Sequence, residues 1–91
     1  MLFEYDPTKS NANLEKHGID FEEAQDLWLG EVLTLKSNLK GENRYKAIGR
    51  ISGEYWMVCF TFRGLRRRII SARRATQKER AAYDRFINDD N

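Results

Sequence analysis

Arginine is concentrated in the last third of the chain. Six arginines lie within twelve residues, with no lysine and no acidic residue between them: Arg63, Arg66, Arg67, Arg68, Arg73 and Arg74. A guanidinium group is planar, stays charged when partly buried and can bind a phosphate through two parallel hydrogen bonds. A surface that served solubility alone would have lysine and acidic residues mixed into such a run. The cluster therefore predicts a site for a polyanion, and the alternative reading is a solvated basic strand.

Few other residues are suited to catalysis. The sequence lacks the G-x-S-x-G, Walker A, H-E-x-x-H and dinucleotide-binding glycine motifs. Its one cysteine and one histidine, Cys59 and His17, can form neither an internal disulfide nor a zinc site with three or four soft ligands. We therefore expect no metal and no other cofactor.

One reaction needs little from the protein except positive charge. In metal-independent RNA cleavage the 2′-hydroxyl of the substrate attacks the adjacent phosphate. The protein then has to align the strand, neutralise the phosphorane and assist proton transfer. The residues that could transfer protons are Glu4, Tyr5, His17 and Glu54. The sequence does not choose among them, although a histidine directly before a glycine is more often part of a helix end.

Charge is unevenly distributed along the chain, which has 16 basic and 14 acidic residues and a net charge of +2. Residues 1–45 carry 5 basic and 9 acidic residues, a net charge of −4, whereas residues 46–91 carry 11 and 5, a net charge of +6. This asymmetry predicts a basic surface for a polyanion beside an acidic surface that repels it. The sequence has no signal-peptide pattern and no run of about 18 apolar residues, so we expect a cytoplasmic protein without a membrane segment.

Helix signals occupy both ends of the chain. Asp6 and Pro7 predict an N-cap and a first helical residue, and Thr76 with Glu79 forms a capping box. Helices are predicted over residues 7–17, over residues 20–29 and from residue 77 onward.

Between these helices the sequence pattern changes to that of strands. Strands are predicted over residues 32–35, 44–51, 54–62 and 66–72, with a further short strand over residues 2–5. Turn residues fill the gaps, including residues 37–43. The nearly continuous apolar run 54–62 is typical of a central strand covered on both faces. The sequence thus predicts one α+β domain over residues 1–91: two N-terminal helices, an antiparallel sheet of about four strands and a C-terminal helix, with the helices against one sheet face.

Strict alternation along the last strand divides the arginine cluster. It predicts Arg66, Arg68 and Ile70 on one face of the sheet, and Arg67, Ile69, Ser71 and Arg73 on the other. Trp28, Trp56 and Phe60 are predicted to pack in the core, and Cys59 to be a small buried hydrophobic residue.

Four blocks of the sequence together resemble a known family. They are F-E-Y-D-P-x-K, A-N-L-E-K-H-G-I-D-F-E-E-A, R-Y-K-A-I-G-R and R-I-I-S-A-R-R-A-T-x-x-E-R-x-x-Y, in this order over residues 3–83. In these blocks the chain resembles the BrnT family of toxins. The resemblance implies a RelE-like fold and a ribonuclease that arrests translation. It also implies neutralisation by a BrnA antitoxin, whose ribbon-helix-helix domain binds operator DNA, so the toxin would reach DNA only within that complex.

The resemblance also assigns candidate residues. Arg68 and Arg73 fall where basic residues of the family serve RNA cleavage. Tyr5 falls where family members often have Trp, which predicts base stacking, and a half-buried core aromatic is the alternative. The remaining predicted RNA-binding residues are Arg66, Arg67, Arg74 and Lys9.

Phe62 departs from the family pattern. In T-F-R-G it stands where family members commonly have an acidic residue, as in T-E-R-G. If that acid transfers a proton, its loss predicts weak activity or an altered mechanism. Two hypotheses follow: a metal-independent endoribonuclease toxin, or a toxin-like module that binds the antitoxin and has little or no nuclease activity.

Overall fold

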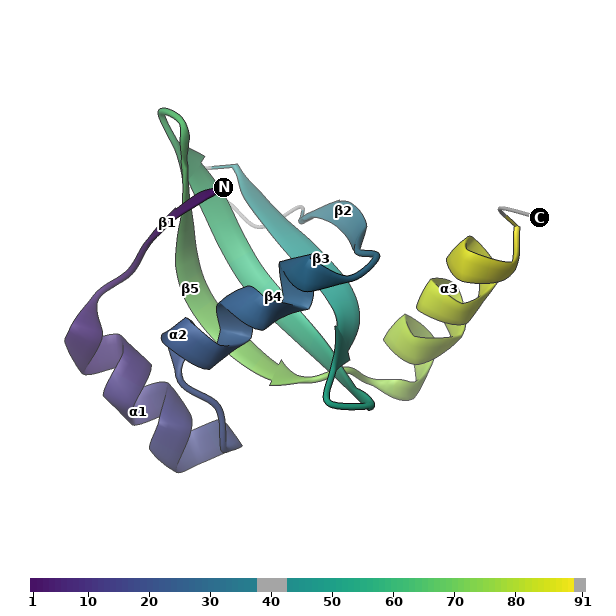
Figure 1. Ribbon diagram of the computed structural model, residues 1–91, viewed down its shortest axis with the longest axis horizontal. Helices are drawn as coiled ribbons and strands as arrows, with labels where there is room; N and C mark the ends of the chain where they lie inside the picture. Colours follow the sequence, from purple (N-terminus) through teal and green to yellow (C-terminus); the bar gives the residue numbers. More distant parts are fainter. Residues whose placement is uncertain (38–42, 90–91) are drawn as a thin grey trace.

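The fold comes from a computed structural model, which describes residues 1–37 and 43–89 (Figure 1). In this part of the chain the strands are β1 (Leu2–Glu4), β2 (Leu33–Ser37), β3 (Arg44–Ile51), β4 (Glu54–Arg63) and β5 (Arg66–Arg74). The helices are α1 (Pro7–His17), α2 (Phe21–Ala24), which continues into a 3-10 helix (Gln25–Leu29), and α3 (Gln77–Asn88). The α+β class is confirmed. The turn predicted over residues 37–43 lies almost wholly outside the described residues.

The predicted caps start and end the helices. Asp6 accepts a hydrogen bond from the Thr8 backbone N–H at 2.8 Å, and α1 ends at Gly18, whose φ of 79° is left-handed. Asp20 caps α2 by accepting from the Glu23 N–H at 2.7 Å. Within residues 1–37 and 43–89, no helix has the length and apolar character needed to cross a membrane.

The sheet has the order β1-β5-β4-β3-β2 among the described residues. Strands β2 to β5 form the predicted antiparallel meander. The short first strand adds a fifth, and it pairs parallel to β5, with Glu4 opposite Arg68. The sheet is therefore mixed rather than antiparallel throughout. The parallel direction arises because β1 and β5 are not joined by a hairpin: the chain between them forms α1, α2 and the rest of the sheet.

Helices cover both faces of the sheet, so the prediction that they pack against one face is wrong. Helices α1 and α2 cover the face that bears Ala47, Val58 and Phe60, which we call the α1 face. Helix α3 packs through Tyr83 against Ile48, Met57 and Cys59 on the other, which we call the α3 face. Figure 1 shows α3 set apart from α1 and α2. The reason is that β4 is apolar at successive positions and presents buried side chains to both sides, as its sequence predicted.

A buried asparagine attaches α1 to β5. The Asn13 side-chain amide donates to the carbonyls of Ile19 and Ala72 at 2.8 and 2.9 Å, and its oxygen accepts from the Ala72 N–H at 3.2 Å. A sequence pattern of apolar residues gives no sign of this polar contact. It fixes the backbone of β5 directly before Arg73.

A β-bulge changes the alternation of β5. Cys59 pairs with Ser71 while its neighbour Phe60 pairs with Ile69, so Ile70 is an extra residue in β5. Arg68 consequently lies opposite Thr61, and Arg73 lies opposite Met57. Thr61 and Met57 are four residues apart on β4 and share one face. Arg68 and Arg73 thus both lie on the α3 face, and the division predicted from strict alternation, with Arg73 beside Arg67, is wrong.

Candidate active site

Arg68 pairs with a carboxylate from the first strand. Its Nη1 donates to Glu4 Oε2 at 3.1 Å, and the two side chains are 28% and 29% exposed. The parallel register of β1 and β5 places these residues opposite each other. Both groups therefore remain accessible to a ligand, and a cation stands beside a potential proton acceptor.

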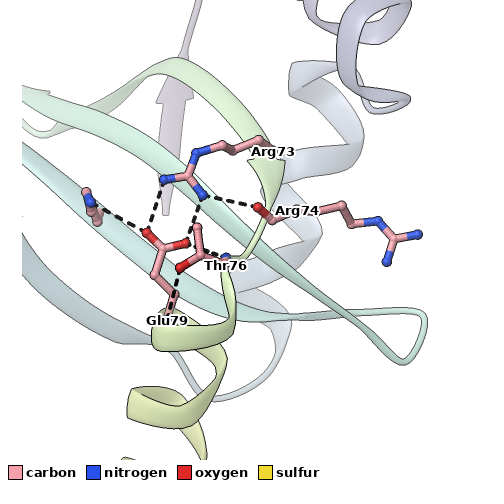
Figure 2. Close-up of polar contacts among 5 residues, drawn as sticks. Arg73, Arg74, Thr76 and Glu79 are labelled. Carbon is pink, nitrogen blue, oxygen red and sulfur yellow. Dashed lines mark hydrogen bonds and ion pairs between the residues drawn. The ribbon is translucent and has the colours of Figure 1, made fainter.

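Arg73 makes a bidentate contact with Glu79 at the start of α3. Its two terminal nitrogens donate to the two carboxylate oxygens at 2.8 and 3.1 Å (Figure 2). Lys46 of β3 approaches the same carboxylate at 3.5 Å. Glu79 also accepts from the Thr76 N–H at 2.9 Å, and Thr76 accepts from the Glu79 N–H, which completes the predicted capping box. One carboxylate thus links the end of β5, β3 and the first turn of α3.

The groups around Glu79 keep its carboxyl group ionised. Burial, which leaves its side chain 11% exposed, would by itself raise the pKa of the carboxyl. The hydrogen bonds from Arg73 and the Thr76 backbone, together with the charges of Arg73 and Lys46, outweigh burial and lower the pKa to about 2. Glu79 is therefore ionised throughout the physiological pH range, and Arg73 faces an oxyanion of the kind that a phosphate would present.

Cys59 lies beneath these cations as a buried group, as its place in the apolar run predicted. Burial raises the pKa of its thiol, and Arg44, Lys46 and Arg73 act in the opposite direction. Lys46 and Ser71 lie opposite Cys59 in the sheet, and Arg44 and Arg73 are each two residues away along the same strands. The three cations therefore lie on the same part of the α3 face. Cys59 itself stays a neutral packing residue.

The α3 face therefore carries two rows of basic residues with β4 between them. Arg44 and Lys46 come from β3, whereas Arg66, Arg68 and Arg73 come from β5. Arg68 and Arg73 are separated by about 13 Å along the sheet, from four residues at about 3.3 Å each. Each guanidinium pairs with its own carboxylate, so the two cations are placed to contact neighbouring phosphates of one strand. The arrangement can bind a polyanion and stabilise negative charge that develops on it.

The other predicted site residues do not join this face. Tyr5 packs edge-on against Phe21, with ring centroids 5.8 Å apart, beneath α1 and α2. Arg67 lies over the rings of Phe60 and Phe62 at 5.9 and 5.1 Å.

The side chains of the last two predicted RNA-binding residues also lie off the α3 face. Arg74 lies 4.9 Å over the ring of Trp56 and forms an ion pair with Glu54. Lys9 is exposed on α1, which packs on the opposite face of the sheet. The residues predicted for one site are thus divided between the two faces.

The structure adds residues that the sequence analysis did not assign to the site. Glu79 was interpreted only as a helix cap, and Arg44 and Lys46 were not singled out. The alternation R-Y-K within β3 is the signal that could have found the last two, since residues two apart share a face. Of the proton-transfer candidates, Glu4 lies beside Arg68, Glu54 binds Arg74 elsewhere, and His17 lies in the last turn of α1.

Phe62 lies on the α1 face near the β4–β5 hairpin. Its ring is 47% exposed and contacts the rings of Tyr45 and Phe60 at centroid distances of 5.3 and 5.4 Å. The position where the family resemblance predicts an acidic residue is thus occupied by part of an aromatic cluster, on the face opposite to Arg68 and Arg73.

Comparison with known proteins assigns the family. A family model described as "Ribonuclease toxin, BrnT, of type II toxin-antitoxin system" matches residues 5–79. The chain belongs to the BrnT family. The resemblance of the four sequence blocks is confirmed, and the matched segment of this BrnT toxin includes Arg68, Arg73 and Glu79. No curated protein matches the chain.

Proposed function

We propose that this BrnT toxin is a metal-independent endoribonuclease that acts in the cytoplasm and inhibits translation by cleaving RNA. The observation that carries the proposal is the shared face of Arg68 and Arg73, each beside a carboxylate, with Lys46 next to the carboxylate that Arg73 binds. The family description as a ribonuclease toxin of a type II toxin-antitoxin system supports RNA as the substrate.

The proposed reaction uses the substrate's own nucleophile. Glu4 accepts the proton of the 2′-hydroxyl, whose oxygen attacks the adjacent phosphorus. The bond from phosphorus to the 5′-oxygen then breaks, and that oxygen takes a proton from solvent water, which leaves a 2′,3′-cyclic phosphate and a 5′-hydroxyl strand. Glu4 releases the proton that it accepted to solvent. Arg68 orients Glu4 and binds the phosphate, while Arg73 and Lys46 neutralise the charge of the phosphorane. Arg66 binds the neighbouring backbone. In this scheme cationic side chains supply the charge stabilisation that a metal ion supplies in other nucleases.

Purified protein tests this proposal directly. In the presence of a chelator, the wild-type protein is expected to cleave RNA and leave cyclic phosphate ends. Arg68→Ala and Arg73→Ala, in variants that unfold at temperatures near that of the wild type, are each expected to reduce cleavage and relieve growth arrest. Full activity of both variants would reject the assignment, and loss of activity with the chelator would reject the metal-independent mechanism.

The proposed partner is a BrnA-like antitoxin with a ribbon-helix-helix domain. A type II system pairs its toxin with a protein antitoxin, and the family description supports this class of partner. Operator DNA is contacted only through the complex. Co-expression is expected to yield a stable toxin–antitoxin complex that retards operator DNA in a gel, whereas the toxin alone leaves that DNA unretarded.

A second candidate function is a module that binds antitoxin without cleaving RNA. Phe62 favours it, because an exposed ring replaces the acid common in the family. Under this alternative the purified protein binds antitoxin and leaves RNA intact. Phe62→Glu is expected to restore cleavage if the acid is what the reaction lacks. Cleavage by the wild-type protein would exclude the alternative.

A further inference from the structure

A basic pocket lies beside the candidate active site, where the end of the sheet meets α3. It has a volume of about 290 Å³, and its walls include Arg50, Glu54, Tyr55, Arg74 and Arg80. Three guanidinium groups and one carboxylate thus line the same space. The sequence blocks include both Arg50 and Arg80, but the proposed reaction uses neither.

Aromatic rings hold these guanidinium groups in position. Arg50 and Arg80 lie over the ring of Tyr55 at 4.5 and 4.7 Å, and Arg74 lies over Trp56. The Tyr55 hydroxyl donates to Asp84 at 2.8 Å, which fixes the ring between the sheet and α3. A guanidinium that rests on a ring keeps N–H groups along its edge for an anion. Arg50 also donates to the Gly53 carbonyl and Arg74 to Glu54, so an anion would meet the other N–H groups of these side chains and of Arg80. With three guanidinium groups to one carboxylate, the charge of the pocket suits a phosphate.

The pocket continues the active site along the chain. Arg74 directly follows Arg73 in β5, and Arg80 directly follows Glu79 in α3. The Arg73 Nη1 donates to the Arg74 carbonyl at 3.1 Å, and the Ala75 N–H donates to the Tyr55 carbonyl at 3.1 Å. These contacts hold the candidate active site and the basic pocket on either side of the junction between β5 and α3. A nucleic-acid strand bound at Arg73 can pass into the pocket with its next phosphates.

We propose that this pocket binds a backbone phosphate of the RNA strand beside the cleaved bond. The inference rests on the proposed nuclease function, because it takes the strand at Arg73 to be substrate RNA. An acidic peptide would meet the same guanidinium groups. RNA is favoured because the pocket lies next to the Arg73 end of the basic face, where a strand already placed for cleavage needs charge neutralisation along its backbone.

Binding of a non-cleavable RNA tests the pocket separately from catalysis. The probe is a single-stranded 2′-O-methyl oligonucleotide of about ten nucleotides, and the protein is the full chain. The double substitution Arg50→Gln and Arg80→Gln is expected to weaken binding about 10- to 100-fold, as for two lost charge-assisted hydrogen bonds. It should also reduce the slope of log affinity against log salt by about 1.4, at about 0.7 per phosphate contact.

Two controls separate a phosphate contact from altered folding. Arg85→Gln removes one positive charge, half of the charge that the double variant removes, from an exposed position of α3 outside the pocket lining, and is expected to change affinity less than about twofold. Arg50→Lys with Arg80→Lys keeps both charges and is expected to keep most of the salt slope. Thermal unfolding checks that each variant is folded.

The outcomes distinguish the pocket from the nuclease function. RNA cleavage by the wild type with unchanged oligonucleotide affinity of the folded double variant overturns the pocket and leaves the nuclease intact. Reduced affinity together with a wild type that cleaves no RNA supports the pocket and rejects the nuclease. A double variant that binds RNA normally but loses antitoxin binding assigns the pocket to the protein partner and overturns the proposal.

Discussion

The arginines of β5 have different environments on the two faces of the sheet. On the α3 face, Arg68 and Arg73 form ion pairs with Glu4 and Glu79. On the other face, Arg67 lies over the rings of Phe60 and Phe62. A guanidinium paired with a carboxylate is held where an oxyanion fits, whereas one that lies over aromatic rings covers apolar surface. The arginines of this one strand thus do not form a single site. Arg68 and Arg73 form ion pairs on one face, and Arg67 packs on aromatic rings on the other.

The largest difference between the faces is expected in RNA cleavage. Arg73→Ala removes a bidentate cation from the proposed site and should lower the cleavage rate by about 100- to 1,000-fold, equivalent to about 3–4 kcal/mol. Arg67→Ala, on the opposite face, should lower it less than tenfold. Single-turnover cleavage of a labelled RNA measures both. Equal losses would mean that the two faces share the reaction.

The stability of packing on the α1 face is expected to depend on hydrogen bonds between uncharged groups. Asn13→Ala removes three contacts to the Ile19 and Ala72 backbones and leaves their buried groups unpaired. The free energy of unfolding should fall by about 3 kcal/mol. Urea denaturation checks this value, which should change little with salt or between pH 5 and pH 8. A strong salt dependence would contradict the assignment of this face to neutral contacts.

The stability that comes from the α3 face is instead expected to fall at low pH. The pKa of Glu79 lies near 2 in the folded protein and near 4.5 in its ordinary state, so the folded state favours the ionised form. Its stabilisation is present above about pH 5 and is lost as the pH falls toward 2. Glu79→Gln should therefore cost about 2 kcal/mol at pH 7 and progressively less at lower pH. Urea denaturation of the wild type and the variant from pH 7 to pH 3 measures the difference in their free energies of unfolding. A difference that does not change with pH would show that the ionisation of Glu79 is not its cause.

The smallest effect is expected for the packing role of Arg67. Arg67→Gln removes the contacts with Phe60 and Phe62 and should reduce the free energy of unfolding by about 0.5–1 kcal/mol. Arg67→Lys should recover part of the loss. Thermal unfolding measures both variants, and a loss as large as that of Asn13→Ala would show that Arg67 has a larger role in the core.

Much of the fold follows from local signals in the sequence. The caps at Asp6 and Thr76 and the bounds of β3 are where the sequence places them, because each depends on neighbouring residues. The bulge at Ile70 depends instead on how β5 pairs with β4, a tertiary property without a local signal. The packing of α3 on the second face likewise depends on Tyr83 reaching across the sheet to donate to the Glu31 carbonyl at 2.9 Å.

The candidate site could be predicted only in part for the same reason. Arg68 and Arg73 were identified by residue type and by family resemblance, but their common face required the bulge. Glu79 has one local role, as a cap, and one long-range role, as the partner of Arg73 and Lys46. Only the local role leaves a pattern in the sequence. Which carboxylates pair with which cations can therefore be predicted only when the register of the strands is known.

The parallel pairing of β1 with β5 has a consequence for biosynthesis. Glu4 precedes its partner Arg68 by 64 residues. Asn13 likewise precedes its partner Ala72 by 59 residues. The nascent chain can fold α1 early, but it can form these contacts only after β5 has been synthesised. The candidate site is therefore assembled late relative to α1, when both β1 and β5 have left the ribosome.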